Sequence, residues 1–391
     1  MRIVFVFLCL IIIVSCSKAK SDKDFFNGKN FSQKRIIIDS IKIDTLDFEV
    51  VESSFDGFLK IDNNNINFID SRFGWFFTFD KYGHLISKNL GQGAGPKEIN
   101  TGFIDAYIKL SNGKHVFIGS GYDVHIHNED FEREKILIMQ WDLKNESYEI
   151  NPQNLNPEMH RLYSPDYSNF NLQQISDNEI YFPILAQHRF FNKFNSHRYF
   201  EESRILAKLN LDSKKIESLE GRKSREYLRY SFLSNYDFFD YQHSLKSNKT
   251  FITYEVDSLI YVYDKSFNNI YSFGNSGKHI GNTDFFEYKG GLNNEKEFRE
   301  AYTFEKSKTG FYKNLIYFED EDILIRTYFI GNSRTQDGMQ VYIKNELIAD
   351  VRVPKAFKVI GKIGDYFYSD IVINEEDNYF KCYKFKLEDV K

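Results

Sequence analysis

The sequence predicts an all-β fold, a six-bladed β-propeller with four-stranded blades. Six prolines, 26 tyrosines and 39 phenylalanines in 391 residues accompany many short alternating apolar and polar runs, which are typical of β-strands. Helical patterning is weak except in Asn293–Lys306, where we expect a few helical turns in a link between blades. A pattern of four short strands separated by polar turns repeats along the chain, most clearly at Gly57–Gly91 and His243–Asn275. A repeated four-stranded unit is the signature of a propeller.

The first sixteen residues are predicted to be a lipoprotein signal peptide. Arg2 precedes an unbroken apolar run, Ile3–Val14, which is shorter than the roughly twenty residues that cross a bilayer as a helix. Small and branched residues then lead to Cys16, which resembles the lipobox cysteine that is acylated in bacterial lipoproteins. The alternative is an ordinary signal peptide that contains a cysteine. A serine directly after the cysteine, here Ser17, is typical of lipoproteins sent to the outer membrane. We therefore expect the protein to be anchored in the outer membrane by a lipid on Cys16, facing the periplasm or the cell surface.

The mature chain is expected to be a tether followed by one domain. Residues 17–34 are polar and rich in lysine without an apolar period, which predicts a flexible tether before a single domain at 35–391. Cys9 leaves with the leader and Cys16 takes lipid, so Cys382 remains and no internal disulfide can form. The formal charge of −5 argues against a nucleic-acid partner, because phosphate binding needs clustered positive charge.

The number of blades follows from the third strand of each repeat, which ends in Asp or a polar equivalent. The six predicted third strands are Phe76–Asp80, Ile136–Asp142, Ile205–Asp212, Leu259–Asp264, Met339–Ile343 and Phe380–Lys386. The last repeat supplies only three strands, which would leave an open sheet edge. We expect the unused strand Arg35–Phe48 to fill that place and close the ring. The alternative architecture is an irregular β-sandwich.

The stretch LGQGAGPKEI, Leu90–Ile99, is the most motif-like in the chain. A Walker loop needs Gly-x4-Gly-Lys-Ser/Thr and a dinucleotide loop needs Gly-x-Gly-x-x-Gly before a helix, and neither spacing is present. Glycines between two strands instead predict a bend where the chain passes from one blade to the next. The link resembles the inter-blade signature of NHL-repeat propellers through Gly91, Gly93, Gly95, Pro96 and Glu98.

The lipobox and the six loose blades together resemble the six-bladed β-propeller lipoproteins of Gram-negative bacteria, which are similar to NHL-repeat and TolB-like propellers. This resemblance covers nearly all of the mature chain and implies extracytoplasmic binding or scaffolding, with no shared catalytic set. The sequence contains neither a Gly-x-Ser-x-Gly elbow nor a His-Glu-x-x-His motif, and we expect no cofactor. The alternative function is an enzyme that acts on glycans or lactones, since paired carboxylates are abundant.

Ligands of propellers usually bind near the axis, where the blade links and the hairpins between second and third strands gather. We expect three of these hairpins to be longer than a tight turn, namely Gly119–Glu134 in the second blade, Ala186–Ser203 in the third and Ile330–Gly338 in the fifth. Because blades two and three are neighbours, their hairpins are expected to form one wall over the axial mouth. The candidate ligand-binding residues of this wall are Asp123, His125, His127, Arg189, His197 and Arg198.

The residue types in this wall favour an acidic ligand. Asp123, His125 and His127 would share one face of a strand and can in principle hold a divalent metal, but no third histidine follows at ligand spacing, and we assign no metal. The alternative is a solvated hairpin. Arg189–Arg198 interleaves basic residues with phenylalanines, which suits a sugar or an anionic glycan, or else packs its rings on the propeller and leaves its charges in water. Histidines beside arginines predict an anionic small molecule, glycan or protein segment, bound more tightly as the pH falls through about 6.5.

Overall fold

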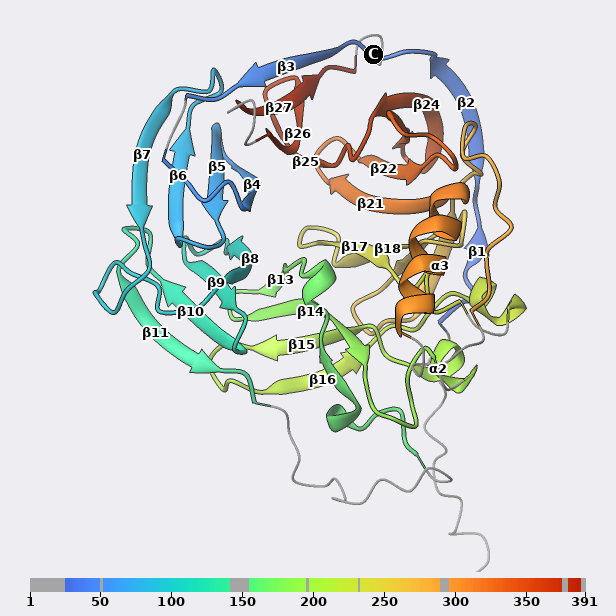
Figure 1. Ribbon diagram of the computed structural model, residues 1–391, viewed down its shortest axis with the longest axis horizontal. Coiled ribbons are helices and arrows are strands. Elements are labelled where there is room, and N and C mark those ends of the chain that lie inside the picture. The colour runs from blue at the N-terminus through green and yellow to red at the C-terminus, as the bar shows by residue number, and fades with distance from the viewer. Residues whose placement is uncertain are drawn as a thin grey trace, which may run out of the picture.

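A computed structural model describes residues 25–49, 52–140, 155–194, 197–230, 233–288, 295–374 and 379–387. In this part of the chain, six small sheets stand in a ring around a central axis (Figure 1). Each sheet is built from consecutive antiparallel strands, and the first strand of each blade lies at the axis. The six-bladed propeller is therefore confirmed.

The first three blades follow the chain in order. Blade 1 contains β4 (Gly57–Asp62), β5 (Asn65–Asp70), β6 (Trp75–Phe79) and β7 (Leu85–Leu90). Blade 2 contains β8 (Ile104–Lys109), β9 (His115–Gly119), β10 (Asp123–His127) and β11 (Arg133–Ile138). Blade 3 contains β12 (Tyr163–Pro165), β13 (Gln173–Ser176), β14 (Glu179–Ala186), β15 (Leu206–Asn210) and β16 (Ile216–Glu220), in which β12 and β13 both pair with β14.

The last three blades take a further strand each from the N-terminal segment. Blade 4 contains β17 (Phe239–Ser244), β18 (Lys249–Tyr254), β19 (Ile260–Tyr263), β20 (Asn269–Phe273) and β1 (Lys29–Asn30). Blade 5 contains β21 (Phe311–Phe318), β22 (Ile323–Phe329), β23 (Gln336–Ile343), β24 (Glu346–Pro354) and β2 (Gln33–Ile38). Blade 6 contains β25 (Val359–Ile363), β26 (Tyr366–Asn374), β27 (Tyr379–Phe385) and β3 (Ile43–Asp47).

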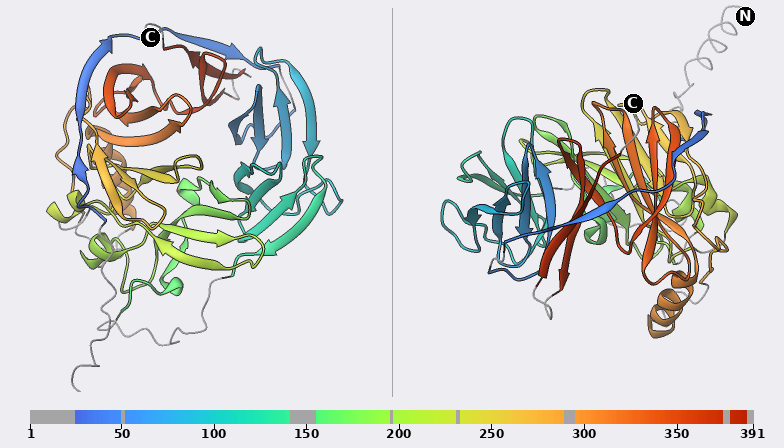
Figure 2. Two further views of the ribbon diagram at one scale, coloured as in Figure 1. Left: turned by 180° about the vertical axis from the view of Figure 1, so that it is seen from behind. Right: turned by 90° about the horizontal axis from the view of Figure 1, so that it is seen from above.

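Within the described residues, helical segments are confined to the connections. The α-helices of this part are α2 (His197–Glu202), between β14 and β15, and α3 (Glu295–Lys308), in the link from blade 4 to blade 5. Its 3-10 helices are η2 (His160–Leu162), η3 (Tyr167–Asn169) and η4 (Arg225–Arg229). The expected helical turns in a blade link are thus confirmed as α3, which projects from one face of the ring in Figure 2.

The middle strands are buried on both faces because each blade is covered by its two neighbours. The strands β9 and β19 are buried at every position, and their sequences HVFIG and IYVY are apolar runs with no exposed alternate. The outer strand β7 is instead mostly exposed or half-buried. Aromatic rings fill the seams between blades, as where Phe68 of blade 1 meets Phe380 of blade 6 with ring centroids 4.7 Å apart.

The N-terminal segment closes the ring. The strand β3 pairs antiparallel with β27, so the prediction that residues before the first blade complete the last one is confirmed. The preceding strands add a parallel strand each to the outer edges of blades 5 and 4, through β2 on β24 and β1 on β20. Residues 25–48 therefore follow the rim of three blades, as the blue ribbon in Figure 1 shows.

The flexible tether predicted for residues 17–34 is wrong for residues 25–34. Phe25 is buried, with the guanidinium carbons of Arg204 and Arg222 at 5.0 and 4.8 Å from its ring centroid. Phe26 packs edge-on against Tyr261 at 5.3 Å. The polar composition misled the prediction because this segment uses its backbone for sheet pairing and only its phenylalanine rings for packing. Residues 17–24 lie outside the described residues.

The second blade also differs from the prediction. Its third strand is β10, whereas the segment Ile136–Asp142 begins within the fourth strand, β11. The stretch Gly119–Glu134 is therefore not an enlarged hairpin, since it contains β10 itself, and the turn between β9 and β10 is only residues 120–122. The two histidines misled the prediction because polar residues in a strand usually mark an exposed face. The other five third strands lie where they were predicted.

The stretch Leu90–Ile99 is a bend between β7 of blade 1 and β8 of blade 2, as expected. Ile99 donates its backbone N–H to the Gly91 carbonyl at 2.8 Å, which folds the link back on itself. Gly93 has a φ of 158°, and a Cβ there would lie 2.0 Å from Oε2 of Glu98. Glycine is favoured at Gly93 because side-chain-bearing residues rarely adopt this φ. The nearby Glu98 carboxylate accepts the Gly95 N–H at 2.7 Å.

The closing strand is expected to carry a large share of the stability. Phe48, directly after β3, packs against Phe79 of blade 1 and Phe380 of blade 6 at 4.9 and 5.3 Å. Because Phe48 is buried in this seam, Phe48→Ala should lower the free energy of unfolding in urea by about 3–5 kcal/mol. The matched control Phe31→Ala, in the same segment but 45% exposed, should cost less than about 1 kcal/mol. Equal costs for the two variants would contradict closure by this seam.

Candidate functional site

An axial channel runs between the inner strands of the blades and opens at one face into a wider pocket. The channel has a volume of about 400 Å³ and is lined by residues of β4, β8, β13, β17, β21 and β25. The mouth pocket has a volume of about 630 Å³. The two cavities share the lining residues Ser168, Phe238, Asn314, Lys358 and Asp370, so the pocket leads into the channel.

The mouth pocket lies on the face where the blade links and the hairpins between second and third strands gather. Lys193 comes from the insertion between β14 and β15, and Tyr302 and Lys306 come from α3. Lys313 lies at the start of the inner strand β21, and Lys358 directly precedes the inner strand β25. Side chains from four blades and from α3 therefore surround one opening.

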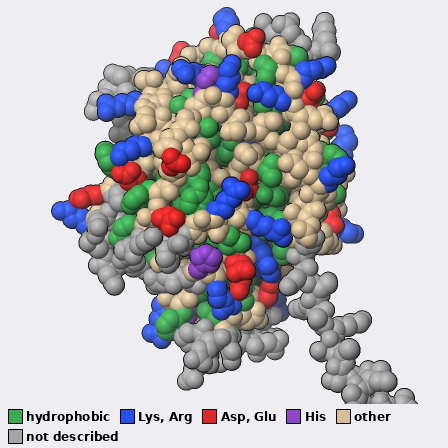
Figure 3. All heavy atoms as spheres, turned by 90° about the vertical axis from the view of Figure 1, so that its right-hand side faces the viewer, with side chains coloured by type: hydrophobic (Ala, Val, Ile, Leu, Met, Phe, Trp, Pro, Cys, Tyr) green, Lys and Arg blue, Asp and Glu red, His purple; other side chains and the backbone are tan. Residues whose placement is uncertain are grey.

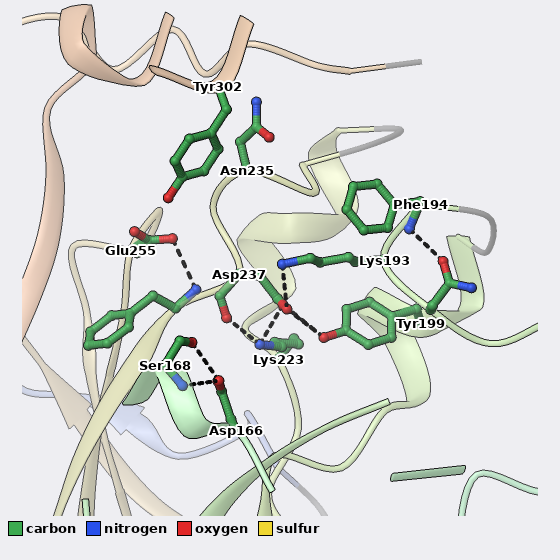
Figure 4. Close-up of polar contacts among 12 residues, drawn as sticks. Asp166, Ser168, Lys193, Phe194, Tyr199, Lys223, Asn235, Asp237, Glu255 and Tyr302 are labelled. Atoms are coloured by element: carbon green, nitrogen blue, oxygen red, sulfur yellow. Dashed lines mark hydrogen bonds and ion pairs between the residues drawn. The ribbon is translucent and has the colours of Figure 1, made fainter. Parts of the chain in front are cut away.

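Asp237 is the centre of one polar cluster in the wall of the mouth (Figure 4). Lys223 Nζ lies 2.6 Å from its Oδ1, Tyr199 donates its hydroxyl to Oδ2 at 2.7 Å, and Lys193 Nζ lies 3.6 Å from Oδ2. Burial raises the pKa of Asp237, but the ammonium groups of Lys223 and then Lys193 outweigh burial and hold the pKa below its usual value. Asp237 is thus an anchored carboxylate.

A second cluster joins α3 to blade 4. Lys306 Nζ lies 2.6 Å from Oε1 of Glu255 and donates to the Asn235 carbonyl at 2.7 Å. The other oxygen of Glu255 accepts the Phe238 N–H at 3.0 Å. The Lys306 ammonium also lies 4.8 Å from the Phe311 ring centroid. These contacts dock the C-terminal half of α3 on the propeller and place Tyr302, a residue that is 39% exposed, at the pocket.

Two further acids hold lysines at the opposite side of the mouth. Asp337 is fully buried, accepts the Ala356 N–H at 3.0 Å, and lies 3.0 Å from Lys355 Nζ and 3.6 Å from Lys313 Nζ. Asp370 accepts two backbone N–H groups, those of Leu59 and Ile371, both at 2.9 Å. Its second oxygen lies 3.6 Å from Lys358 Nζ. Backbone N–H groups therefore satisfy part of the hydrogen-bonding capacity of each carboxylate, and the lysine ammonium groups compensate its charge.

At the mouth, four lysine side chains are more exposed than the carboxylate with which each is paired. The side-chain exposures, lysine before acid, are 29% and 10% for Lys193 and Asp237, 14% and 3% for Lys306 and Glu255, 27% and 0% for Lys313 and Asp337, and 47% and 20% for Lys358 and Asp370. Lys223, at 3% against 10% for Asp237, is the exception. These four pairs thus expose more of the lysine than of the acid. The side wall of the ring in Figure 3, by contrast, intermixes basic and acidic side chains.

The residues predicted from blade 2 do not belong to this mouth. His125 and His127 are buried in β10, where Nε2 of His125 is hydrogen-bonded to Oδ2 of Asp123 at 2.6 Å and Nδ1 of His127 to the Phe131 carbonyl at 2.9 Å. Burial lowers the pKa of His127, so this imidazole does not gain charge near pH 6.5. The predicted wall of histidines beside arginines is therefore wrong.

The residues predicted from blade 3 lie in a real insertion but outside the mouth lining. Arg189 is exposed and stacks on Phe190, while Arg198 in α2 pairs with Glu202 at 2.6 Å and His197 is exposed beside it. The rings of Phe191, Tyr199 and Phe200 are buried. The alternative interpretation, rings packed on the propeller with charges in water, is the one the structure supports.

The lysines of the mouth were missed by the sequence analysis. Lys193 lies inside the predicted insertion, but the prediction named Arg189 and Arg198 of that insertion as ligand-binding residues instead. Lys313 and Lys358 stand where the chain enters an inner strand, in FYKN and FKVIG. A search for charged residues at the start of each first strand would have found both, because these positions face the axis at the link side.

The described residues form neither a metal site nor a membrane-spanning helix. Within these residues, no three His, Cys, Asp or Glu side chains come together as a metal site. None of the described helices combines the length and the apolar character needed to cross a bilayer. Cys382, which is free and buried, has its pKa raised to about 12 by burial. It is therefore no nucleophile at neutral pH.

Comparison with known proteins shows the fold. No family model and no curated protein match this chain. It is similar to the crystal structure of a member of the DUF4221 family from Bacteroides vulgatus, with a TM-score of 0.63 and 12% identity over 89% of this chain and 97% of that one. It is also similar to a Bacteroides fragilis protein described as exported, with a TM-score of 0.54 and 14% identity over 92% and 99%.

These comparisons and the site define a class of protein, a six-bladed β-propeller with a polar pocket at its axial mouth. At such identities the similarity carries the fold alone. The NHL and TolB likeness of the link at Leu90–Ile99 receives no support from the comparisons. A propeller of this kind fits a binding or scaffolding domain, since its loops and pocket stand on a rigid ring.

Buried histidines should make the protein acid-sensitive. Burial, and then Lys109, lowers the pKa of His115 to about 4, and burial lowers that of His243 to about 4. Both are neutral in the folded state, whereas the unfolded chain takes up protons below about 6.5. Stability is therefore full above pH 6.5 and falls as the pH approaches 4, by on the order of 2 kcal/mol for each histidine.

The test compares melting temperatures between pH 7.5 and 4.5 for the parent and the His115→Gln, His243→Gln double variant. The double variant should show a flatter decline over this range. Asp105, whose pKa burial raises to about 6, acts in the opposite direction and is present in both proteins, so it cancels in the comparison. Parallel declines would show that these imidazoles do not control the acid response.

Proposed function

We propose that this protein is a lipid-anchored, extracytoplasmic propeller that binds an acidic small molecule or an acidic glycan at the mouth of its axial channel. The observation that carries the proposal is the exposure of the lysines. Lys193, Lys306, Lys313 and Lys358 line the pocket, and the side chain of each is more exposed than the carboxylate with which it pairs.

An acidic ligand fits because the buried acids hold the lysines in place without needing the ligand. When the ammonium group of a mouth lysine turns toward an entering carboxylate, the acid it leaves still has other partners. Asp337 and Asp370 still accept backbone N–H groups, and Asp237 still pairs with Lys223 and accepts the Tyr199 hydroxyl. Charge-assisted bonds of this type are stronger than neutral ones. The exposed Tyr302 ring supplies an apolar face of the kind on which sugars stack.

Binding is favoured over catalysis by the state of the carboxylates. A glycan-hydrolysing enzyme needs a carboxylic acid that can donate a proton to the leaving oxygen. Asp237 has a lowered pKa, and Glu255, whose pKa burial raises, is 3% exposed and bonded to Lys306 and the Phe238 N–H. These acids of the mouth are occupied by structural contacts, so the enzyme acting on glycans or lactones remains the second candidate.

The anchor is proposed from the sequence, since Cys16 lies outside the described residues. The similar Bacteroides fragilis protein, described as exported, supports an extracytoplasmic location. Phe25 is held by Arg204 and Arg222, and the adjoining Phe26 packs on Tyr261 of blade 4. Only nine positions separate Phe25 from Cys16, so an acylated Cys16 would keep the propeller within roughly 30 Å of the outer membrane.

The lysines of the mouth should determine affinity for acids. Galacturonic acid trimers and neutral galactose trimers are suitable probes for isothermal calorimetry. We expect the parent protein to prefer the acidic trimer, and the Lys313→Gln, Lys358→Gln double variant to lose at least about tenfold in affinity for it, since each charge-assisted bond contributes about 1.5–3 kcal/mol.

The control for this experiment is Lys81→Gln with Lys88→Gln, which removes two exposed lysines from the rim of blade 1. It changes the net charge equally and should leave affinity unchanged. Melting curves should show both double variants folded, because Asp337 retains Lys355 and Asp370 retains its backbone donors. A preference for the neutral trimer, or unchanged affinity in the mouth variant, would refute the acidic ligand.

Lipid anchoring should depend on Cys16. In a Gram-negative host, Cys16→Ser should move the protein from the membrane fraction to the soluble fraction, because serine cannot take the thioether-linked lipid. Cys9→Ala is the matched control, since it changes the other cysteine of the leader and should leave the protein on the membrane. If Cys16→Ser fractionates with membranes as the parent does, the anchor is not a lipid on this residue.

A further inference from the structure

Lys60 lines the axial channel beneath the mouth pocket and has no part in the proposed acid-binding site. It lies on the inner strand β4 of blade 1, between Leu59 and Ile61. Leu59 donates its backbone N–H to Asp370. The channel of about 400 Å³ around Lys60 has room for a small organic molecule entering through the mouth. Lys60 therefore presents an amine to a cavity at the centre of the ring.

The acids nearest to Lys60 are committed elsewhere. Asp370 accepts the backbone N–H groups of Leu59 and Ile371 and pairs with Lys358. Asp240, across the channel, accepts the N–H groups of Leu315 and Tyr241, both at 2.8 Å. No carboxylate of the described residues lies within ion-pairing distance of the Lys60 ammonium. A lysine in this position is not held as a salt-bridge cation.

Its surroundings favour the neutral amine. Burial, followed by repulsion from Lys358, lowers the pKa of Lys60 from 10.5 to about 8, although Asp370 and Asp240 act in the opposite direction. A sizeable fraction of the amine is therefore unprotonated near pH 7.5. Desolvation beside a second cation is a known way to make a lysine nucleophilic.

A proton carrier lies in the same channel. Asp105, on β8 of the adjoining blade 2, lines the cavity, and its Oδ2 has no hydrogen-bond partner among the described residues. Burial raises its pKa to about 6, with Asp123 contributing repulsion. Unlike the acids of the mouth, Asp105 is neither paired with a lysine nor committed to the backbone through Oδ2. It can exchange a proton with water in the channel, which can relay that proton to a reaction at Lys60.

We infer that Lys60 is a nucleophilic amine that captures a small aldehyde or ketone as a reversible imine inside the axial channel. The amine nitrogen forms a bond to the carbonyl carbon, and the carbonyl oxygen takes up the proton that the nitrogen loses, which gives a carbinolamine. Asp105, in its protonated form and through channel water, donates a proton to the hydroxyl as the carbon–oxygen bond breaks and water leaves. The nitrogen of the resulting iminium ion returns a proton to the Asp105 carboxylate by the same route, which leaves the imine. The overall change is amine plus carbonyl to imine plus water, so no oxidant or reductant is required.

The charges of the mouth pocket favour one class of carbonyl compound as the partner of Lys60. A substrate that reaches Lys60 passes Lys313 and Lys358, so a carbonyl carrying a carboxylate, such as a small 2-oxo acid, is the favoured class. This part of the inference rests on the proposed function. The imine at Lys60 stands without it, because the channel, the unpaired amine and Asp105 do not depend on the lysines of the mouth.

The test is reductive trapping followed by peptide mapping. The purified folded protein is treated at pH 7.5 with glyoxylate and sodium cyanoborohydride, which converts an imine into a stable secondary amine. Lys60 should be modified at least about tenfold faster than exposed lysines such as Lys81 and Lys88, although it is the less accessible residue. The rate of its modification should rise with pH around a midpoint near 8.

Matched variants separate the outcomes. Lys60→Arg keeps the positive charge but cannot form an imine and should lose the rapid modification, and Lys60→Met serves if the arginine variant melts early. Asp105→Asn should slow modification of Lys60 while leaving Lys81 unchanged. Modification of Lys60 no faster than of exposed lysines would overturn the inference. Equal rates with glyoxylate and neutral glycolaldehyde would instead refute the acidic substrate class and leave the imine chemistry standing.

Discussion

The pairing of β3 with β27 is the constraint on which the rest of the structure depends. Each blade buries both faces of its middle strands only if a neighbour covers each side, so six sheets are stable together when the last meets the first. The chain supplies this contact with residues that precede blade 1. Phe48 then fills the seam between blades 6 and 1. Closure sets the inner strands around one axis and thereby creates the channel.

The same contacts that join blades also arrange the charges at the axis. Asp240 of blade 4 accepts the N–H of Leu315 in blade 5, and Asp370 of blade 6 accepts the N–H of Leu59 in blade 1. These carboxylates are oriented by the backbone of the next blade. Lys358, which lines the mouth pocket, is paired with one of them, Asp370. Charge at the mouth is thus a consequence of how the blades are locked together.

Lys60 and the lysines of the mouth show how one residue type takes different properties from its surroundings. Lys306 has a carboxylate at 2.6 Å, and although burial acts to lower its pKa, Glu255 raises it above the usual value. Lys60 has no such partner among the described residues, and burial lowers its pKa. The first kind of lysine suits the binding of an anion, and the second suits reaction with a carbonyl group.

The sequence by itself determined the all-β class, the number of blades, closure by the N-terminal strand and the helix before blade 5, because strand alternation and repeats are local patterns. It also located the blade 3 insertion that carries Lys193. Only the tertiary structure decided that His125 and His127 are buried, that residues 25–34 follow the rim, and that Lys313 and Lys358 meet at the mouth. These facts depend on which strands become neighbours across the ring, and burial or pairing between residues hundreds of positions apart leaves no local signal in the chain.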